Sequence, residues 1–155
     1  MGDIVYKKPK LDAIAQMQEL VLPEIKSGKI LFRSDDEVAT NIRSYTLATK
    51  QERVVGFVAL HIHTPTLAEV RSLIVSEQMR GHGIGAKLVQ SCIREAHELG
   101  IERLFTLTYE QRFFEKLGFS EIPKESLPEH KIWADCVKCK HFPICDEVAL
   151  IYNLS

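Results

Sequence analysis

The residues with the clearest chemical potential form a glycine-rich loop, Arg80-Gly81-His82-Gly83-Ile84-Gly85. The start of a helix leaves about four backbone N–H groups without partners, and the helix dipole adds roughly half a positive charge there. Glycine has no Cβ, so an anion can approach these N–H groups closely, and an arginine in the loop adds a cation. A helix that begins at this loop would therefore bind a phosphate or pyrophosphate. The alternative is a turn between two elements that binds no ligand.

The elements on either side of the loop fit this interpretation. Residues 71–75 are mostly apolar and β-branched, which predicts a buried strand. Beyond the loop, apolar residues recur every three or four positions and indicate one face of a helix that ends at Gly100; they are Leu88, Val89, Cys92, Ile93, Ala96 and Leu99. Residues 101–108 predict a further strand, and a crossover of this length favours a parallel pair with the first.

Two nucleotide-binding motifs do not fit the loop. A P-loop requires Lys-Ser or Lys-Thr after its last glycine, and here Ala86-Lys87-Leu88 follows. The dinucleotide fingerprint requires a third glycine where Lys87 and Leu88 stand. The pattern that remains, Arg-x-x-Gly-x-Gly after a strand, resembles the acyl-CoA pyrophosphate loop of the GNAT superfamily of N-acetyltransferases. This resemblance implies an α/β GNAT fold, with a mixed central sheet that is splayed at the acyl-CoA site and flanked by helices.

Composition limits the remaining classes. The chain has 155 residues, 26% of them charged, and a net charge of −1, so we expect a single domain over residues 1–155. The charge argues against nucleic-acid and membrane-surface binding, which usually need a basic face. No apolar run approaches the roughly 20 residues that span a bilayer. The first residues lack the apolar core of a signal peptide, so we expect a cytoplasmic protein.

Along the chain, the pattern predicts further elements around this centre. A strand at residues 4–6 precedes a helix that Asp12 would cap and Pro23 would break or restart, and Ser34 would begin a second helix. Strands follow at residues 44–49 and 53–62, then a short helix at 111–117 and strands from 119 and over 148–153. His61 and His63 share one face of a strand. Their spacing suits a metal, but without a third ligand polar residues at a strand edge are the preferred interpretation.

Two further groups of residues allow two interpretations each. Glu69 and Arg71 share one face of the central strand, either as a solvated strand end or as a carboxylate near a reacting amine. A later segment carries three cysteines and a histidine that could form a tetrahedral zinc site; they are Cys136, Cys139, Cys145 and His141. A reduced loop without metal is the alternative there. Cys92, on the apolar helix face, is predicted to be a core residue.

Within the superfamily, the chain most resembles the acetyltransferase domain of N-acetylglutamate synthase, an amino-acid N-acetyltransferase of arginine biosynthesis. Three segments carry this resemblance. Residues 28–34, Gly-Lys-Ile-Leu-Phe-Arg-Ser, are similar to that family's Gly-x-Leu-x-x-Arg-Ser. Ala68-Glu69-Val70 precedes the central strand, and Leu107-Thr108 is followed by residues 113–119, Phe-Phe-Glu-Lys-Leu-Gly-Phe.

The resemblance implies a role for each matching residue. Backbone groups of the central strand would hold the pantetheine arm of acetyl-CoA, at Leu73, Ile74 and Val75. The loop would hold the pyrophosphate, at Arg80, Gly81, His82, Gly83, Ile84 and Gly85. Glu69 would accept the proton of the amine, and the acceptor would be bound by Arg33, Arg71 and Ser72. The planar guanidinium of an arginine suits a substrate carboxylate.

Two positions depart from the resembled families. Many GNAT enzymes carry a tyrosine that protonates the leaving thiolate, and Phe114 stands there, which leaves Tyr109 as the nearest hydroxyl in sequence. Residues 133–147 carry three cysteines with Asp146 and Glu147, where the resembled family has a basic substrate-binding element. We therefore expect acetyl transfer from acetyl-CoA to the α-amine of an amino acid, with glutamate as the first candidate. A peptide, lysine or small-amine acceptor, a non-catalytic acyl-CoA sensor, a zinc-bearing module and a homodimer stay open.

Overall fold

In a computed structural model of the chain, the described residues are 3–28, 32–127 and 147–154, and seven strands among them form one sheet. The spatial order is β1-β2-β3-β4-β5-β7-β6. The strands are β1 (Ile4–Lys7), β2 (Tyr45–Lys50), β3 (Arg53–Ile62), β4 (Leu67–Val75), β5 (Arg103–Thr108), β6 (Ser120–Ile122) and β7 (Val148–Asn153). The helices are α1 (Ile14–Lys26), α2 (Asp35–Thr40), α3 (Ile84–Leu99) and α4 (Gln111–Lys116). No helix in this part of the chain is long and apolar enough to cross a membrane.

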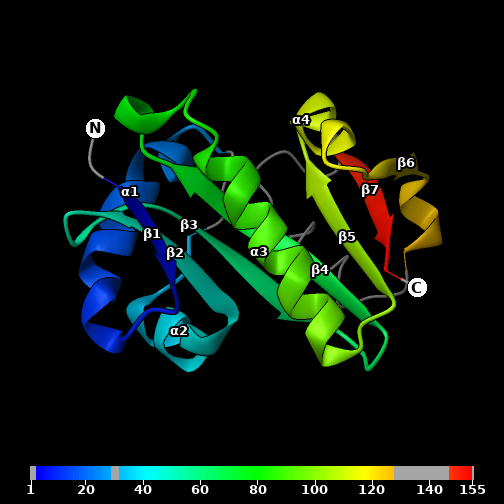
Figure 1. The fold of residues 1–155 in the computed structure, drawn as a ribbon, viewed down its shortest axis with the longest axis horizontal. Helices are drawn as coiled ribbons and strands as arrows, with labels where there is room; N and C mark the ends of the chain where they lie inside the picture. Colours follow the sequence, from blue (N-terminus) through cyan, green and yellow to red (C-terminus); the bar gives the residue numbers. More distant parts are fainter. Residues whose placement is uncertain (1–2, 29–31, 128–146, 155) are drawn as a thin grey trace.

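The sheet is mixed, and one pair of its strands is parallel. Strands β1 to β4 form an antiparallel meander, β4 and β5 run parallel, and β7 lies antiparallel to both β5 and β6. Figure 1 shows α3 running across the middle of the sheet, with α1 and α2 on one side of the view and α4 with β5 to β7 on the other. The parallel pair joined through α3 confirms the prediction from the crossover length.

Two apolar layers hold the helices against opposite faces of the sheet. Side chains alternate between faces along a strand, so Val58 and Leu60 of β3 pack under α3, while Phe57 and Ala59 pack under α1 and α2. Cys92 lies in the first layer, as predicted, and burial, with a smaller contribution from the charge of Glu95, raises the pKa of its thiol to about 12. The thiol therefore stays protonated at neutral pH.

The predicted helix boundaries are partly confirmed. The hydroxyl of Ser34 accepts a hydrogen bond from the N–H of Glu37 at 3.1 Å and caps α2. Gly100 ends α3 in the left-handed conformation, with φ +86°. The prediction for Asp12 is wrong, because Leu11–Ala13 form a 3-10 turn and α1 begins after Ala13 without a side-chain cap.

The prediction that Pro23 breaks the first helix is also wrong, because α1 continues through it to Lys26. A proline inside a helix removes one backbone hydrogen bond and strains the preceding turn. Met17 and Val21 of α1 are buried against the sheet. Tertiary packing of this apolar face opposes the local cost, which sequence pattern alone could not weigh.

The most consequential feature of the sheet is the early separation of β4 from β5. The two strands pair at Leu67–Arg103, Ala68–Leu104 and Glu69–Phe105, and the pairing goes no further. Against β3, the register passes from Arg71 opposite Ala59 to Ile74 opposite Phe57, so two residues of β4 oppose one of β3. Such a β-bulge bends the strand that carries it. Ser72 lies in this bulge with a left-handed φ of +57°.

A side chain replaces the strand pairing where the two strands separate. Thr106 of β5 is buried, and its hydroxyl donates to the carbonyl oxygen of Val70 at 2.9 Å. A buried carbonyl without a partner is costly, so this hydroxyl satisfies the first group of β4 that loses its neighbour strand.

We expect Thr106→Val to lower the free energy of unfolding by about 1–3 kcal/mol, because it removes the hydroxyl and leaves the Val70 carbonyl buried without that donor. The measurement is urea denaturation followed by circular dichroism. Thr106→Ser is the matched control, since it keeps the hydroxyl and should lose less stability. Equal stability of the wild type and the valine variant would contradict this role of the hydrogen bond.

Candidate active site

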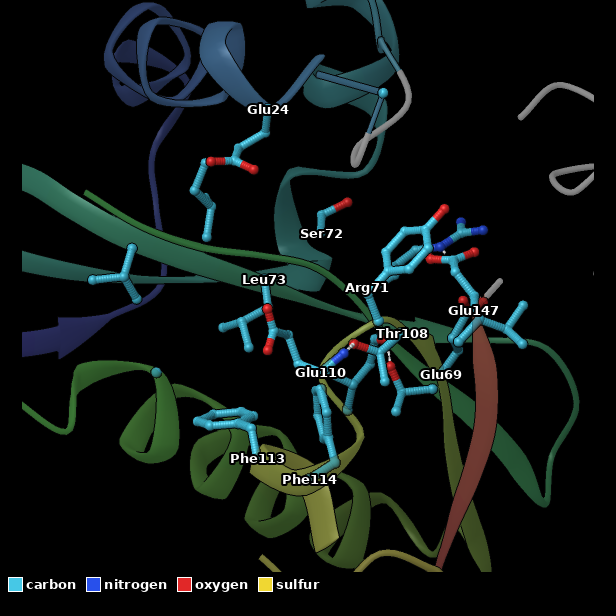
Figure 2. Close-up of a pocket in the computed structure, with 18 of the residues that line it drawn as sticks. Glu24, Glu69, Arg71, Ser72, Leu73, Thr108, Glu110, Phe113, Phe114 and Glu147 are labelled. Carbon is cyan, nitrogen blue, oxygen red and sulfur yellow. Dashed lines mark hydrogen bonds and ion pairs between the residues drawn. The ribbon is translucent and has the colours of Figure 1, made fainter. Parts of the chain in front are cut away.

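A cleft of about 440 Å³ opens where β4 and β5 separate. Figure 2 shows its walls: Ser72 and Leu73 of β4 lie across the middle, Phe113 and Phe114 of α4 below them, and Glu24 of α1 on the far side. The end of β5 and Glu147, just before β7, also contribute to the lining. The cleft is therefore built from elements far apart in the sequence that the sheet brings together.

The backbone of β4 turns polar groups toward this cleft. Antiparallel residues alternate between pairs that bond to the neighbouring strand and pairs that face away from it. Ser76 donates its N–H to the carbonyl of Val55 in β3 at 2.8 Å, so the N–H and C=O of the preceding residue, Val75, face away from β3. In agreement, the Val75 oxygen accepts a hydrogen bond from Nε of Arg80 at 3.2 Å. The N–H of Val75 thus faces the open side of the strand.

The glycine loop presents the start of α3 to the same side of the molecule. Gly81 and Gly83 have φ values of +84° and +79°, a conformation in which residues with a Cβ are strained. Gly83 is the N-cap of α3. Among the described residues, no protein group accepts a hydrogen bond from the backbone N–H groups of residues 81–86. This row of N–H groups can hold an anion without giving up an existing bond.

Arg80 lies between the loop and the cleft. Its Nη2 is 3.0 Å from Oε1 of Glu24, and its side chain is about half exposed. Exposed ion pairs contribute little to stability, so the guanidinium can exchange this carboxylate for another anion at small cost. Arg80 therefore can serve a ligand that reaches from the cleft to the loop.

Glu69 lines the cleft, and its carboxylate is largely buried. Its side chain is 9% exposed, which excludes the alternative of a solvated strand end. Oε1 lies 2.9 Å from Nε2 of His63 and 3.5 Å from Nε of Arg71. Within the described residues, Oε2 accepts no hydrogen bond. No buried side-chain oxygen there lacks a hydrogen-bond partner, so Oε2 is in contact with solvent. A carboxylate in this position can accept a proton from a ligand.

Two arginines, Arg33 and Arg71, also line the cleft. Nη1 of Arg33 lies 2.8 Å from Oε2 of Glu37, and its backbone oxygen accepts a hydrogen bond from Gln18 at 2.7 Å. Burial raises the pKa of the Tyr45 hydroxyl, and the positive charges of both arginines oppose that rise. The two guanidinium groups therefore lie near one buried phenol, although 38 positions separate them in the sequence.

The structure brings most of the predicted site residues to this cleft. The lining includes Glu69, Arg71, Ser72, Leu73, Ile74, Val75, Arg80, Gly85, Tyr109 and Arg33. Gly81, His82, Gly83 and Ile84 are outside it, and the Ile84 side chain is buried in the core, so that residue could offer a ligand only its backbone.

The two groups of residues that were considered as metal ligands have different outcomes. The proposed zinc ligands Cys136, Cys139, His141 and Cys145 lie outside the described residues. Among residues 3–28, 32–127 and 147–154, no cluster of three metal-binding side chains occurs. The side chain of His63 is 7% exposed and contacts Glu69, so the interpretation as a polar edge residue is wrong for His63.

Sequence reasoning missed several residues of the site. Thr106, Thr108 and Glu110 line the cleft, and Thr108 accepts a hydrogen bond from the N–H of Glu110 at 2.9 Å. Alternating threonines at the end of an apolar strand were the available signal. Phe114 is buried and packs edge to face against Phe119, with ring centroids 5.2 Å apart. Its side chain therefore contributes to the core and has no hydroxyl group.

Comparison with known proteins decides the family. The model of the GNAT acetyltransferase family matches residues 12–119, which is more than half of the chain. This chain belongs to the GNAT acetyltransferase family. It is accordingly an N-acetyltransferase that uses acetyl-CoA. The GNAT fold predicted from the glycine loop is confirmed.

Two relatives are similar over most of their length. An uncharacterized N-acetyltransferase of Chlorobaculum tepidum is 39% identical over 127 residues, which cover 82% of this chain and 81% of the relative. An amino-acid acetyltransferase of Mycobacterium tuberculosis is 43% identical over 122 residues, which cover 76% and 69%. An amino-acid acetyltransferase of Haemophilus ducreyi is 31% identical, but the match spans 28% of that protein.

Solved structures agree on the fold. The N-acetylglutamate synthase of Neisseria gonorrhoeae, solved with coenzyme A and N-acetyl-glutamate, has a TM-score of 0.89 at 22% identity. The match covers all of this chain and 36% of that one. A Mycobacterium tuberculosis protein solved in complex with CoA has a TM-score of 0.82, also at 22% identity, over 97% of this chain and 99% of that one. At this identity the likeness establishes the fold alone.

The two caps of α3 allow a matched test of the loop. Gly83 and Gly100 both have left-handed φ values, and a Cβ added at either would meet no atom within 4 Å. We expect Gly83→Ala and Gly100→Ala to lose a similar stability of about 1 kcal/mol through backbone strain. Only Gly83→Ala should raise KM for acetyl-CoA, by roughly tenfold, because its Cβ stands among the N–H groups that face the anion. Steady-state kinetics and thermal unfolding measure the two effects, and equal KM values would contradict anion binding here.

Proposed function

We propose that this enzyme acetylates the α-amine of an amino acid that carries a second carboxylate, glutamate first. The observation that carries the proposal is the convergence of Arg33 and Arg71 on the same cleft as the buried carboxylate of Glu69. An amino acid with an acidic side chain has two carboxylates for two guanidinium groups and one amine for the base. The amino-acid acetyltransferase of Mycobacterium tuberculosis, 43% identical, supports the same class of acceptor.

Acetyl-CoA would lie along the open edge of β4. Its pyrophosphate would be held by the N–H groups of residues 81–86 and by Arg80, and its pantetheine arm by backbone groups of residues 73–75. The acetyl group would then lie near Glu69, which faces the solvent through Oε2. The N–H of Val75, which faces away from β3, would donate to the oxygen that becomes negative during transfer.

The reaction is a direct attack of the neutral amine on the thioester. A free α-amine has a pKa near or above 8, so at neutral pH most acceptor molecules carry an extra proton. Glu69 would remove that proton through a water molecule. The nitrogen then bonds to the acetyl carbon, the carbon–sulfur bond breaks, and coenzyme A leaves as the thiolate. The proton that the nitrogen loses as the amide forms passes through cleft water to this thiolate. Phe114 offers no acid there, and Tyr109 and Ser72 bring hydroxyls to the cleft lining.

The first experiment measures release of the CoA thiol with each of the twenty amino acids, a peptide and small amines, against a control without acceptor. We expect glutamate to give the highest kcat/KM, and Arg33→Ala to raise its KM roughly ten- to hundredfold, because an ionic hydrogen bond is lost. Arg43→Ala is the matched control, since Arg43 is exposed and does not line the cleft. Release with a peptide or small amine instead would overturn the amino-acid acceptor, and an unchanged KM would remove Arg33 from the site.

The role of Glu69 has a separate test. We expect Glu69→Gln to lower kcat by roughly 100-fold near pH 7, because the amide cannot accept the proton of the acceptor. The difference should shrink as pH rises, since solvent then deprotonates the amine in place of the enzyme. The pH–rate profiles of the two proteins, each saturated with both substrates, measure this effect. Parallel profiles would show that Glu69 is not the base.

A further inference from the structure

His63 is the residue at the centre of this inference, and it belongs to no role assigned above. Its side chain is 7% exposed, slightly less than the 9% of the Glu69 side chain. In the β3–β4 hairpin His61 stands directly opposite Glu69, which places His63 on the diagonal to it. Nε2 of His63 lies 2.9 Å from Oε1 of Glu69, a good hydrogen-bond distance.

The imidazole ring is held on two sides. It packs against Phe105 of β5 with ring centroids 5.4 Å apart, and against His61 edge to face at 4.6 Å. The backbone N–H of His63 donates to the carbonyl of Leu67 at 3.0 Å and closes the hairpin. The ring therefore has little freedom to turn away from the carboxylate.

The chemistry of the contact fixes the direction of the hydrogen bond. An ionised carboxylate can only accept, so the imidazole nitrogen that meets it carries the hydrogen. Oε1 of Glu69 then faces His63 Nε2, with Arg71 Nε at 3.5 Å on the same oxygen. The hydrogen bond from His63 and the ion pair with Arg71 both involve Oε1, and among the described residues no hydrogen bond to Oε2 is formed. The carboxylate is thus anchored by one oxygen and open to the cleft through the other.

We propose that His63 is a positioning residue for the transfer reaction: it donates Nε2–H to Oε1 of Glu69 and keeps Oε2 turned to the acceptor amine. A glutamate side chain has three rotatable bonds, so without this donor the carboxylate would sample orientations that do not reach the amine. His63 itself exchanges no proton with the substrate. This inference rests on the proposed role of Glu69 as the base.

Two amide substitutions separate positioning from packing. His63→Gln can place an N–H near the position of Nε2, whereas His63→Asn carries the same amide on a shorter chain that does not reach Oε1. We expect the glutamine variant to keep kcat within about threefold of the wild type and the asparagine variant to lose roughly tenfold. KM for acetyl-CoA should stay unchanged in both. His63→Phe, which keeps a ring against Phe105 but has no donor, should match the asparagine variant.

The controls address folding and unrelated histidines. His97→Gln removes an exposed histidine of α3 and should leave kcat unchanged. Thermal unfolding shows which variants are folded, and either the asparagine or the phenylalanine variant is sufficient for the comparison with glutamine. Equal kcat values for glutamine and for the folded variant without a donor would overturn the proposal, whether both are low or both are normal.

A double-mutant cycle then tests whether His63 acts through Glu69. In the Glu69→Gln background, His63→Asn or His63→Phe should lower kcat by less than twofold, because the base that His63 positions is already absent. A further tenfold loss in that background would show a structural effect and overturn the inference. If Glu69→Gln alone leaves kcat unchanged, the proposed base is wrong. The two failures are therefore distinguishable.

Discussion

The site depends on one constraint, the separation of β4 from β5 after three paired residues. Two parallel strands inside a sheet would normally continue to pair, because each unpaired backbone group away from water has a free-energy cost. Here the bulge that contains Ser72 bends β4, and the hydroxyl of Thr106 satisfies the carbonyl of Val70. Beyond that point the backbone of β4 faces the cleft. The fold thus leaves hydrogen-bonding groups of a central strand open to a ligand.

The same separation explains why the buried groups of the site cluster where they do. Glu69 is the last residue of β4 that pairs with β5, so its backbone is fixed by strands on both sides while its carboxylate reaches the cleft. A buried carboxylate needs hydrogen-bond donors, and His63, which directly follows β3 in the hairpin, supplies one. A rigid backbone and an anchored oxygen suit the proposed role of Glu69, because a base must accept a proton in one orientation.

The features that could be predicted from the sequence are those that depend on interactions between residues close together in the chain. The glycine loop, α3 and the parallel crossover depend on local spacing, and the sequence pattern predicted all three. The path of α1 through Pro23 depends on packing against the sheet, and local propensity predicted a break.

The contacts across strands were harder to predict. Arg33 was assigned to the acceptor site from the family resemblance. Sequence spacing alone would not have identified it, because Arg33 reaches the cleft only through the tertiary structure. The pairing of His63 with Glu69 was within reach of a register argument, since the Thr64-Pro65-Thr66 turn places the two residues diagonally across one hairpin. The burial of both side chains could not be predicted in this way, because it depends on Phe105 from a strand that is distant in sequence.

The charges of the cleft suggest how it selects its ligands. Among the described lining residues, each arginine already meets a carboxylate: Arg33 meets Glu37, Arg71 meets Glu69 and Arg80 meets Glu24. An anionic ligand can therefore replace one carboxylate with another, whereas a neutral ligand would have to break an ion pair without compensation. Glu37 and Arg80 are substantially exposed, so their pairs are weak and easily exchanged. The pair of Arg71 with Glu69 is largely buried and should persist, since separating it would leave the charge of the proposed base without this partner. Arg71 would then meet a substrate carboxylate through Nη groups of the same guanidinium.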